Sequence, residues 1–149
     1  MRIREMKAQD VPALVRIEEA TFSEPWSEGA FSDALSDSQA FFLVAADEET
    51  DRPLSYAGMY VAADEGEITN VATDPAFRRQ GLAEAVLSRV KEIGEEKNLT
   101  QLVLETRKSN EPAIALYEKL GFAIAGERKG FYRFPPEDAY VMILRYPDA

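Results

Sequence analysis

Hydrophobic and polar positions recur along the chain with two periods, and these periods predict which segments are strands and which are helices. Apolar runs or strict alternation predict strands. Apolar positions that recur every three to four residues predict helices. The predicted strands are MRIREM, QAFFLVAAD, LSYAGMYVAA, EITNVATDP, LTQLVLET, FAIAGERKGFY and AYVMILRY. The predicted helices are DVPALVRIEEATF, a short helix in SEPWSEGAFSDAL, residues 81–97, and SNEPAIALYEKLGF.

The order of these elements indicates the fold class. They follow one another as β-α-α-β-β-β-α-β-α-β-β, which predicts an α/β protein with a mixed (α+β) sheet and helices on both faces. No stretch has the composition of a flexible linker. Residues 1–149 are therefore expected to form a single domain.

Local sequence signals predict where the helices begin and end. Asp10 and Ser27 are expected N-caps of the first two helices, and Asn110 is the expected N-cap of the last. Gly121 is expected to end that last helix, because glycine adopts the left-handed conformation of a helix C-terminus without strain. The segment RFPPED is predicted to be a loop between the last two strands.

Composition excludes several kinds of chemistry. The 149 residues include no histidine and no cysteine, so Ser-His-Asp and Cys-His triads and ordinary zinc sites are excluded, and no metal is expected. Acid–base chemistry must rely on Glu, Asp, Tyr, Lys, the backbone or water. The charged start MRIREM has no apolar signal region, and the run FFLVAA is too short to span a bilayer. A soluble, cytoplasmic protein that does not act at a membrane is expected.

Charge is spread unevenly along the chain. The net charge is -10, and residues 18–77 hold fourteen acidic residues and one basic residue, Arg52, whereas residues 78–149 are nearly neutral. Such a chain argues against a nucleic-acid partner, which needs a basic face. An acidic first half suits a cationic partner, although the same composition also serves an ordinary solvated surface.

The stretch TDPAFRRQGLAEAVL combines a strand end, two arginines, a glycine and the start of a helix. A helix N-terminus has unpaired N–H groups and a partial positive charge, and glycine lets a ligand approach the backbone. The combination favours a phosphate site, although the spacing is not that of the usual phosphate-binding loops. On these residues alone, two solvated arginines on a capped turn explain the pattern equally well.

These same residues resemble a known family. Arg78 to Ala83, RRQGLA, preceded by NVATDP, resemble the acetyl-CoA signature Q/R-x-x-G-x-G/A of the GNAT N-acetyltransferases. Further matches are similar to the RimI branch of that family, whose members acetylate the N-terminal alanine of a ribosomal protein. They are FSEPWS (22–27), LETR (104–107), SN (109–110), AIALY (113–117), LGF (120–122) and EDA (137–139). The resemblance implies one acyl-CoA N-acyltransferase domain with acetyl-CoA as cosubstrate.

The resemblance also implies which residues hold acetyl-CoA. The backbone N–H groups at the start of the third helix would bind the pyrophosphate. The preceding strand would pair with the pantetheine arm, and Asn110 would hydrogen-bond that arm. Residue by residue, the implied cofactor-binding positions are Val71, Ala72, Thr73, Arg79, Gln80, Gly81, Leu82, Ala83, Glu84 and Asn110.

Two further residues carry the implied chemistry. By strand alternation Glu105 projects with Val103 and Arg107, away from Leu102 and Leu104. The RimI resemblance assigns Glu105 as general base, acting through water, and Tyr117 as general acid. Without the resemblance, Glu105 could be a solvated strand-end residue paired with Arg107. Tyr117 could then simply pack in the core.

Proton chemistry favours an α-amine as substrate. An α-amine has a pKa of about 8 and lysine about 10.4, so supplying neutral lysine at pH 7 costs about 3 kcal/mol more. RimI-type enzymes act on small-subunit ribosomal protein eighteen, whose start is basic, and the acidic segment 18–77 would complement such a partner. Trp26, Phe131 and Tyr132 are expected either to line a peptide groove or to anchor loops.

Two alternatives remain beside an N-terminal alanine acetyltransferase. Acidic charge would serve an acetyltransferase for a polyamine or another small cationic amine equally well. The second alternative is a sensor domain that binds CoA but catalyses no acetyl transfer. The presence of Glu105, Asn110 and Tyr117 together argues against it. The protein is expected to act as a monomer.

Overall fold

The computed structural model describes residues 1–147 and contains the element order that the sequence predicts. Its helices are α1 (Val11–Thr21), α2 (Glu28–Leu35), α3 (Leu82–Glu96) and α4 (Glu111–Leu120), with short 3-10 turns η1 (Ala8–Asp10) and η2 (Pro75–Phe77). Its strands are β1 (Arg2–Glu5), β2 (Ala40–Ala46), β3 (Pro53–Ala62), β4 (Glu65–Thr73), β5 (Gln101–Arg107), β6 (Ala123–Arg133) and β7 (Pro136–Arg145). Residues 148 and 149 of the expected domain lie outside this description.

All seven strands form one mixed sheet, in the order β1-β2-β3-β4-β5-β7-β6. Neighbouring strands are antiparallel except for β4 and β5, which are parallel. A parallel pair requires a crossover connection, and here η2 and α3 provide it. The predicted fold class is confirmed.

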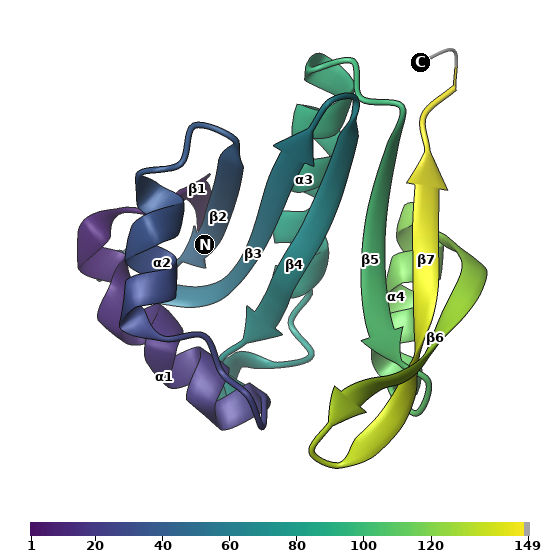
Figure 1. The fold of residues 1–149 in the computed structure, drawn as a ribbon. Coiled ribbons are helices and arrows are strands. Elements are labelled where there is room, and N and C mark those ends of the chain that lie inside the picture. Colours follow the sequence, from purple (N-terminus) through teal and green to yellow (C-terminus); the bar gives the residue numbers. More distant parts are fainter. Residues whose placement is uncertain (148–149) are drawn as a thin grey trace.

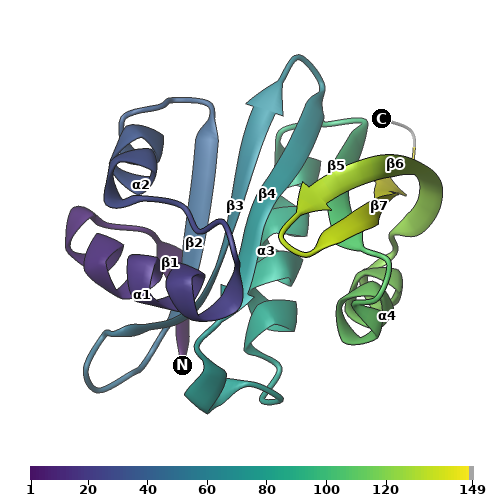
Figure 2. The same ribbon diagram turned by 60° about the horizontal axis from the view of Figure 1, so that its bottom comes forward.

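The helices cover the two faces of the sheet in pairs, so that two separate cores form. α1 and α2 lie on one face, called the front face below, and α3 and α4 lie on the other, the back face (Figures 1 and 2). The back core gathers residues such as Leu82, Val86 and Leu102, and the front core residues such as Leu14, Phe31 and Tyr56. No helix covers the front of β5 and β7 (Figure 1).

Most of the predicted caps are confirmed, but Asp10 has a different role. Ser27 Oγ accepts a hydrogen bond from the N–H of Ala30 at 3.1 Å, and Gly121 ends α4 with φ +111°. The Asp10 carboxylate instead accepts from the N–H of Lys7 and forms an ion pair with Arg4 at 2.8 Å. α1 follows η1 without a break, so the Asp10 side chain caps the preceding turn rather than α1.

The prediction that RFPPED forms a loop is wrong. β6 continues to Arg133 and β7 begins at Pro136, so only two residues form the turn. Tyr132 pairs with Glu137 across this hairpin. A proline is tolerated at the first position of a strand, where its missing N–H breaks no ladder bond. The hairpin therefore extends further than its proline content indicated.

No helix among residues 1–147 combines the length and apolarity needed to cross a membrane.

Candidate active site

β4 and β5 separate part of the way along their length. They pair only between residues 65–67 and 101–103, although β4 continues to Thr73 and β5 to Arg107. Figure 1 shows the two strands diverging toward the ends that carry their arrowheads. Beyond residue 67 the edge of β4 that faces β5 has no strand partner. We call this opening between the diverging strands the wedge.

A bulge in β4 explains the divergence. The register with β3 passes from the pair Gly58 and Asn70 directly to the pair Met59 and Ile68, so Thr69 is an extra residue on β4. An extra residue bends its strand and increases the local twist. The bulge lies just after the last residues that pair with β5. It therefore turns the rest of β4 away from β5 and exposes backbone N–H and C=O groups to an extended ligand.

Both parallel strands point their carboxyl ends toward the same edge of the sheet, and a helix begins beyond each. β4 leads through η2 into α3, and β5 leads to Asn110 at the start of α4. The wedge and two helix N-termini are thus brought together at one edge (Figure 2). Helix N-termini carry partial positive charge, which suits an anionic ligand.

The start of α3 has the unpaired donors that a polyanion requires. Arg79 and Gly81 both have left-handed backbones, with φ +65° and +76°. Within residues 1–147, the N–H groups of residues 79–84 donate to no acceptor, and the first satisfied donor is Ala85, which bonds to the Gly81 carbonyl at 3.1 Å. A Cβ placed on Gly81 would meet nothing within 4 Å. The site is open and fits a pyrophosphate.

The other residues implied for CoA lie at the same edge. Val71, Ala72 and Thr73 form the end of β4 beside the wedge, and Ala72 and Thr73 are held by Ser55, whose hydroxyl bonds both. Asn110 Oδ1 accepts from the N–H of Ala113 at 3.3 Å as the α4 cap. The oxygen of Asn110 is therefore engaged, whereas its amide NH2 is free to donate to a ligand.

Glu105 projects from the front face of β5. Its neighbours Leu104 and Thr106 are buried on the other side of the strand, as the alternation predicted. Its side chain is 14% exposed, and its nearest cation is Arg128 at 3.7 Å. Burial raises the pKa of Glu105, the charge of Glu67 raises it further, and Arg128 partly opposes both. The suggested partner Arg107 instead binds Glu137 at 3.2 Å.

Tyr117 belongs to the back core, on the opposite face of the sheet from Glu105. Its ring packs edge-on against Phe122 at 6.0 Å. Its hydroxyl forms no hydrogen bond with any described residue. Every fully buried side-chain oxygen in this part of the chain has a hydrogen-bond partner, so the Tyr117 hydroxyl is not fully buried. Burial, and then the nearby Tyr132, raise the pKa of Tyr117. The hydroxyl is therefore a donor at neutral pH.

A network that the sequence did not predict joins the end of β5 to the β6–β7 hairpin. Glu137 accepts from Ser109 Oγ at 3.0 Å and from the Ser109 N–H at 2.7 Å, and it pairs with Arg107. The Arg107 guanidinium lies 4.2 Å from the centre of the Tyr132 ring, and burial raises the pKa of Tyr132 to about 12. These contacts fix the hairpin over β5. The segment EDA, which contains Glu137, matched the family in the sequence, but the sequence did not indicate that Glu137 binds Arg107 and Ser109.

A second network holds the α1–α2 loop. Glu18 is buried, accepts from the Trp26 N–H at 2.8 Å and accepts from the Tyr56 hydroxyl. Trp26 packs against Phe31, Phe42 and Tyr60, with ring centres 5.3, 5.6 and 6.4 Å away. Of the two roles open to it, Trp26 therefore anchors a loop. Sequence reasoning missed Glu18, because a glutamate on an amphipathic helix normally faces solvent.

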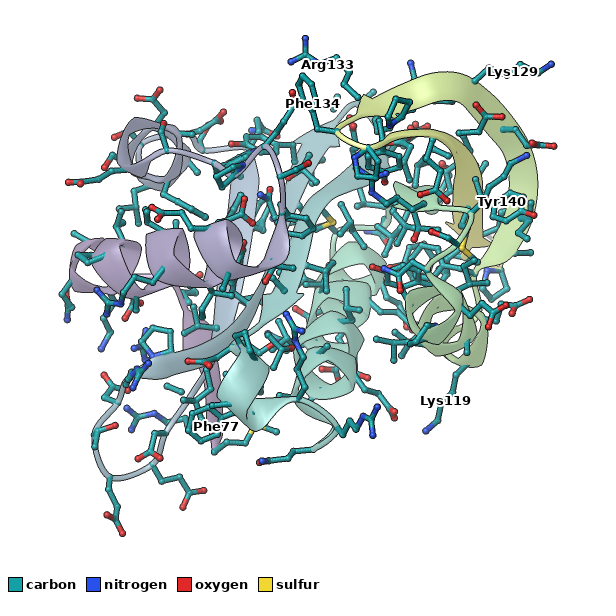
Figure 3. All side chains as sticks on the ribbon, turned by 90° about the horizontal axis from the view of Figure 1, so that it is seen from below. Phe77, Lys119, Lys129, Arg133, Phe134 and Tyr140 are labelled. Atoms are coloured by element: carbon teal, nitrogen blue, oxygen red, sulfur yellow. The ribbon has the colours of Figure 1, made fainter. Side chains whose placement is uncertain are left out.

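The tip of the β6–β7 hairpin contacts the α1–α2 loop. Arg133 pairs with Glu24 of the α1–α2 loop. Figure 3 shows Arg133 and Phe134 at the hairpin tip, and Phe77 and Lys119 far from it on the other side of the molecule. Phe131 is 42% exposed. The hairpin tip and the α1–α2 loop thus meet, whereas Phe131 remains available for contact.

Some acidic residues of the first half are already paired with cations, and others are not. At the β2–β3 turn, Asp51 pairs with Arg2 and Arg4, and Glu48 with the N-terminal amine. Arg4 and then Arg2 lower the pKa of Asp51 to about 2. That group is neutralised locally and is not free for a cationic partner. Glu67, Asp33 and Asp37 form no ion pair among the described residues, so some uncompensated negative charge remains near β4 and α2 on the front face. Residues 1–147 contain no cluster of ligands suited to a metal ion.

Comparison with known proteins identifies one family of acetyltransferases. The model of the Acetyltransferase (GNAT) family matches residues 11–122. The [ribosomal protein bS18]-alanine N-acetyltransferase of Escherichia coli (strain K12) is 35% identical over 144 residues, covering 95% of each chain. Its counterpart in Salmonella typhimurium is 36% identical over 141 residues, covering 93% of each. A crystal structure of the ribosomal-protein-S18-alanine N-acetyltransferase from Escherichia coli superposes with a TM-score of 0.89 at 33% identity, covering 99% of this chain and 95% of that one.

Proposed function

Because the chain belongs to the GNAT acetyltransferase family, in its RimI branch, and is an N-acetyltransferase, we propose that it acetylates the N-terminal alanine of ribosomal protein bS18 with acetyl-CoA as donor. The main support for this substrate is the similarity, over nearly the whole chain, to enzymes named for that reaction. We also propose that residues 1–149 form one domain that acts as a monomer.

The cosubstrate is proposed to bind along the wedge. The N–H groups of Arg79, Gln80, Gly81, Leu82, Ala83 and Glu84 hold the pyrophosphate, since these donors have no partner within the described chain. The edge of β4 at Val71, Ala72 and Thr73 pairs with the pantetheine arm, and the Asn110 amide donates to it. Acetyl-CoA supplies an activated thioester. No metal is needed for this binding or for the transfer.

The two catalytic residues are proposed to act from opposite faces of the sheet. Glu105, on the front face, takes a proton from the substrate ammonium through water, which leaves a neutral amine able to attack. Tyr117, in the back core, donates to the sulfur that leaves. A free thiol has a pKa of about 8.5 and a free tyrosine about 10. Burial raises the pKa of Tyr117 further. Complete proton transfer is thus uphill, and the hydrogen bond to the developing thiolate is the main contribution of Tyr117.

The pyrophosphate site can be tested by calorimetry. CoA should bind roughly 30-fold more tightly than pantetheine, because charge-assisted hydrogen bonds contribute about 2 kcal/mol in total at a partly exposed site. Gly81→Val should abolish most of this difference, since a side chain enters the open helix start and the backbone there has φ +76°. Gly126→Val is the control, because Gly126 also has open space around it but no such backbone. Equal affinity for CoA and pantetheine would rule out the site.

The substrate can be tested with two basic peptides and acetyl-CoA, read by mass spectrometry. One peptide begins with a free alanine, and the other is identical but blocked at its α-amine, with its lysines intact. Transfer is expected only to the first, because the α-amine is neutral at a much lower pH than lysine. Spermidine serves as the small-amine competitor. Acetylation of spermidine but of neither peptide would replace the proposal with the small-amine alternative.

A further inference from the structure

Glu67 stands at the apex of the wedge. It is the last residue of β4 that pairs with β5, and its register partner is Val103. Directly adjacent residues of neighbouring strands project from the same face of a sheet, and so do residues two apart on one strand. Val103 shares its face with Glu105. Glu67 and Glu105 therefore both project from the front face, on the two strands that border the wedge.

The spacing of the two residues suits a single cation. One strand spacing and two residues of strand rise separate Glu67 from Glu105, which places their backbones about 8 Å apart. Each glutamate side chain is long enough to shorten that separation at its carboxylate. An ammonium group makes charge-assisted hydrogen bonds of about 2.8 Å, so one ammonium between the two side chains could donate to both.

The charges around this pair leave it short of cations. Glu67 is exposed and belongs to no ion pair of the described residues, and the cation nearest Glu105 is Arg128 on β6 at 3.7 Å. From the other elements, Tyr132 of β6 also faces Glu105, and the register partner of Glu105 on β7 is the apolar Val141. On the far side of Glu67, its partner on β3 is Tyr60.

Further acids continue this surface beyond Tyr60. Burial raises the pKa of Tyr60, and the charges of Asp37 and Asp33 from the end of α2 raise it further. The surface next to Glu67 is thus lined by negative charge on the α2 side as well. A cation that enters the wedge from the front face meets uncompensated carboxylates, of which Glu67 is the one adjacent to Glu105.

We propose that Glu67 is a second carboxylate of the active site, which binds the substrate α-ammonium together with Glu105. This inference rests on the proposed function. In the reaction the ammonium gives one proton through water to Glu105, and its nitrogen then forms the bond to the acetyl carbon while the bond from that carbon to the CoA sulfur breaks. The nitrogen's second proton goes to the departing thiolate, so that CoA leaves as the free thiol, and Glu67 stays ionised throughout. The product amide carries no charge, so Glu67 attracts the substrate but not the product. Its negative charge also makes Glu105 a stronger base.

The test compares Glu67→Gln with Glu65→Gln on the free-alanine peptide. Glu67→Gln should raise the peptide KM about 3- to 10-fold, since one of two charge-assisted contacts is lost, and leave the acetyl-CoA KM unchanged. A unit charge at about 8 Å shifts a pKa by roughly 0.4 to 1.5 units at effective dielectric constants of about 80 to 20. The pKa of Glu105 should fall by that amount. It is followed by carbon NMR of the carboxyl resonance that disappears in Glu105→Gln.

Glu65→Gln is the matched control. It removes the same charge from the same face of the same strand, but further from Glu105, and Glu65 is hydrogen-bonded to Gln101 at 2.8 Å, a bond that glutamine can keep. It should leave the peptide KM within about twofold and the Glu105 pKa nearly unchanged. If Glu67→Gln behaves like Glu65→Gln while the wild-type enzyme acetylates the peptide, the inference fails and the proposed function stands. If the wild-type enzyme does not acetylate the peptide, the proposed function fails first. In that case an unchanged Glu105 pKa in Glu67→Gln also overturns the pairing of the two carboxylates.

Discussion

Replacing Glu105 by glutamine is expected to lower kcat for the alanine peptide by about 100- to 1,000-fold, within the range that a positioned general base contributes. Glutamine keeps the shape and hydrogen bonding of the side chain but cannot accept the proton of the ammonium. Burial and the charge of Glu67 raise the pKa of Glu105. The carboxylate therefore binds its proton at a higher pH than an ordinary glutamate does. An ordinary glutamate has a pKa near 4.5, and that of Glu105 is higher. As pH falls, wild-type kcat should therefore begin to decline at a higher pH than an ordinary glutamate would give.

Steady-state kinetics between pH 5 and 9 check this prediction. In Glu105→Gln the decline assigned to Glu105 should be absent, and the remaining pH dependence should follow the substrate amine alone. Glu118→Gln is a suitable control, because Glu118 is an exposed carboxylate on α4. A Glu105→Gln enzyme with wild-type kcat would remove Glu105 from the mechanism while leaving the fold and the CoA site untouched.

Replacing Tyr117 by phenylalanine is expected to lower kcat about 10- to 100-fold with little change in stability. A hydrogen bond to a charged group contributes about 1.5–3 kcal/mol, and the developing thiolate is such a group. The Tyr117 hydroxyl bonds to no described residue. Its removal therefore breaks no bond within this part of the folded protein. Single-turnover rates and the thermal midpoint measure the two effects separately.

Tyr146→Phe gives the opposite result and serves as the control. The Tyr146 hydroxyl donates to the Lys91 carbonyl at 2.7 Å, so its loss should cost about 1 kcal/mol of stability. Activity should stay near that of the wild type. If Tyr117→Phe instead lowered the thermal midpoint as much as Tyr146→Phe and left kcat unchanged, Tyr117 would be a packing residue only.

Local patterns predicted the elements well because each depends on neighbours in the chain. The strand alternation of LVLET placed Glu105 opposite Leu102 and Leu104, and the structure confirms it. Gly121 ends α4, and Asn110 caps it. The pattern failed at Asp10, whose carboxylate binds Arg4 and the Lys7 N–H. That failure arose because a polar side chain at a helix start has more than one partner within reach.

The sequence alone thus determined the order of elements, the position of the glycine at the start of α3, and the identity of the residues that the family resemblance singles out. Only the tertiary structure decided where β4 leaves β5, that Glu18 is buried under Trp26, and that Glu67 and Glu105 share the front face. The physical reason is that periodicity and capping act over a few residues. Strand register, bulges and the surroundings of a carboxylate are set by residues far apart in the chain, such as Glu67 and Val103, which the fold brings side by side.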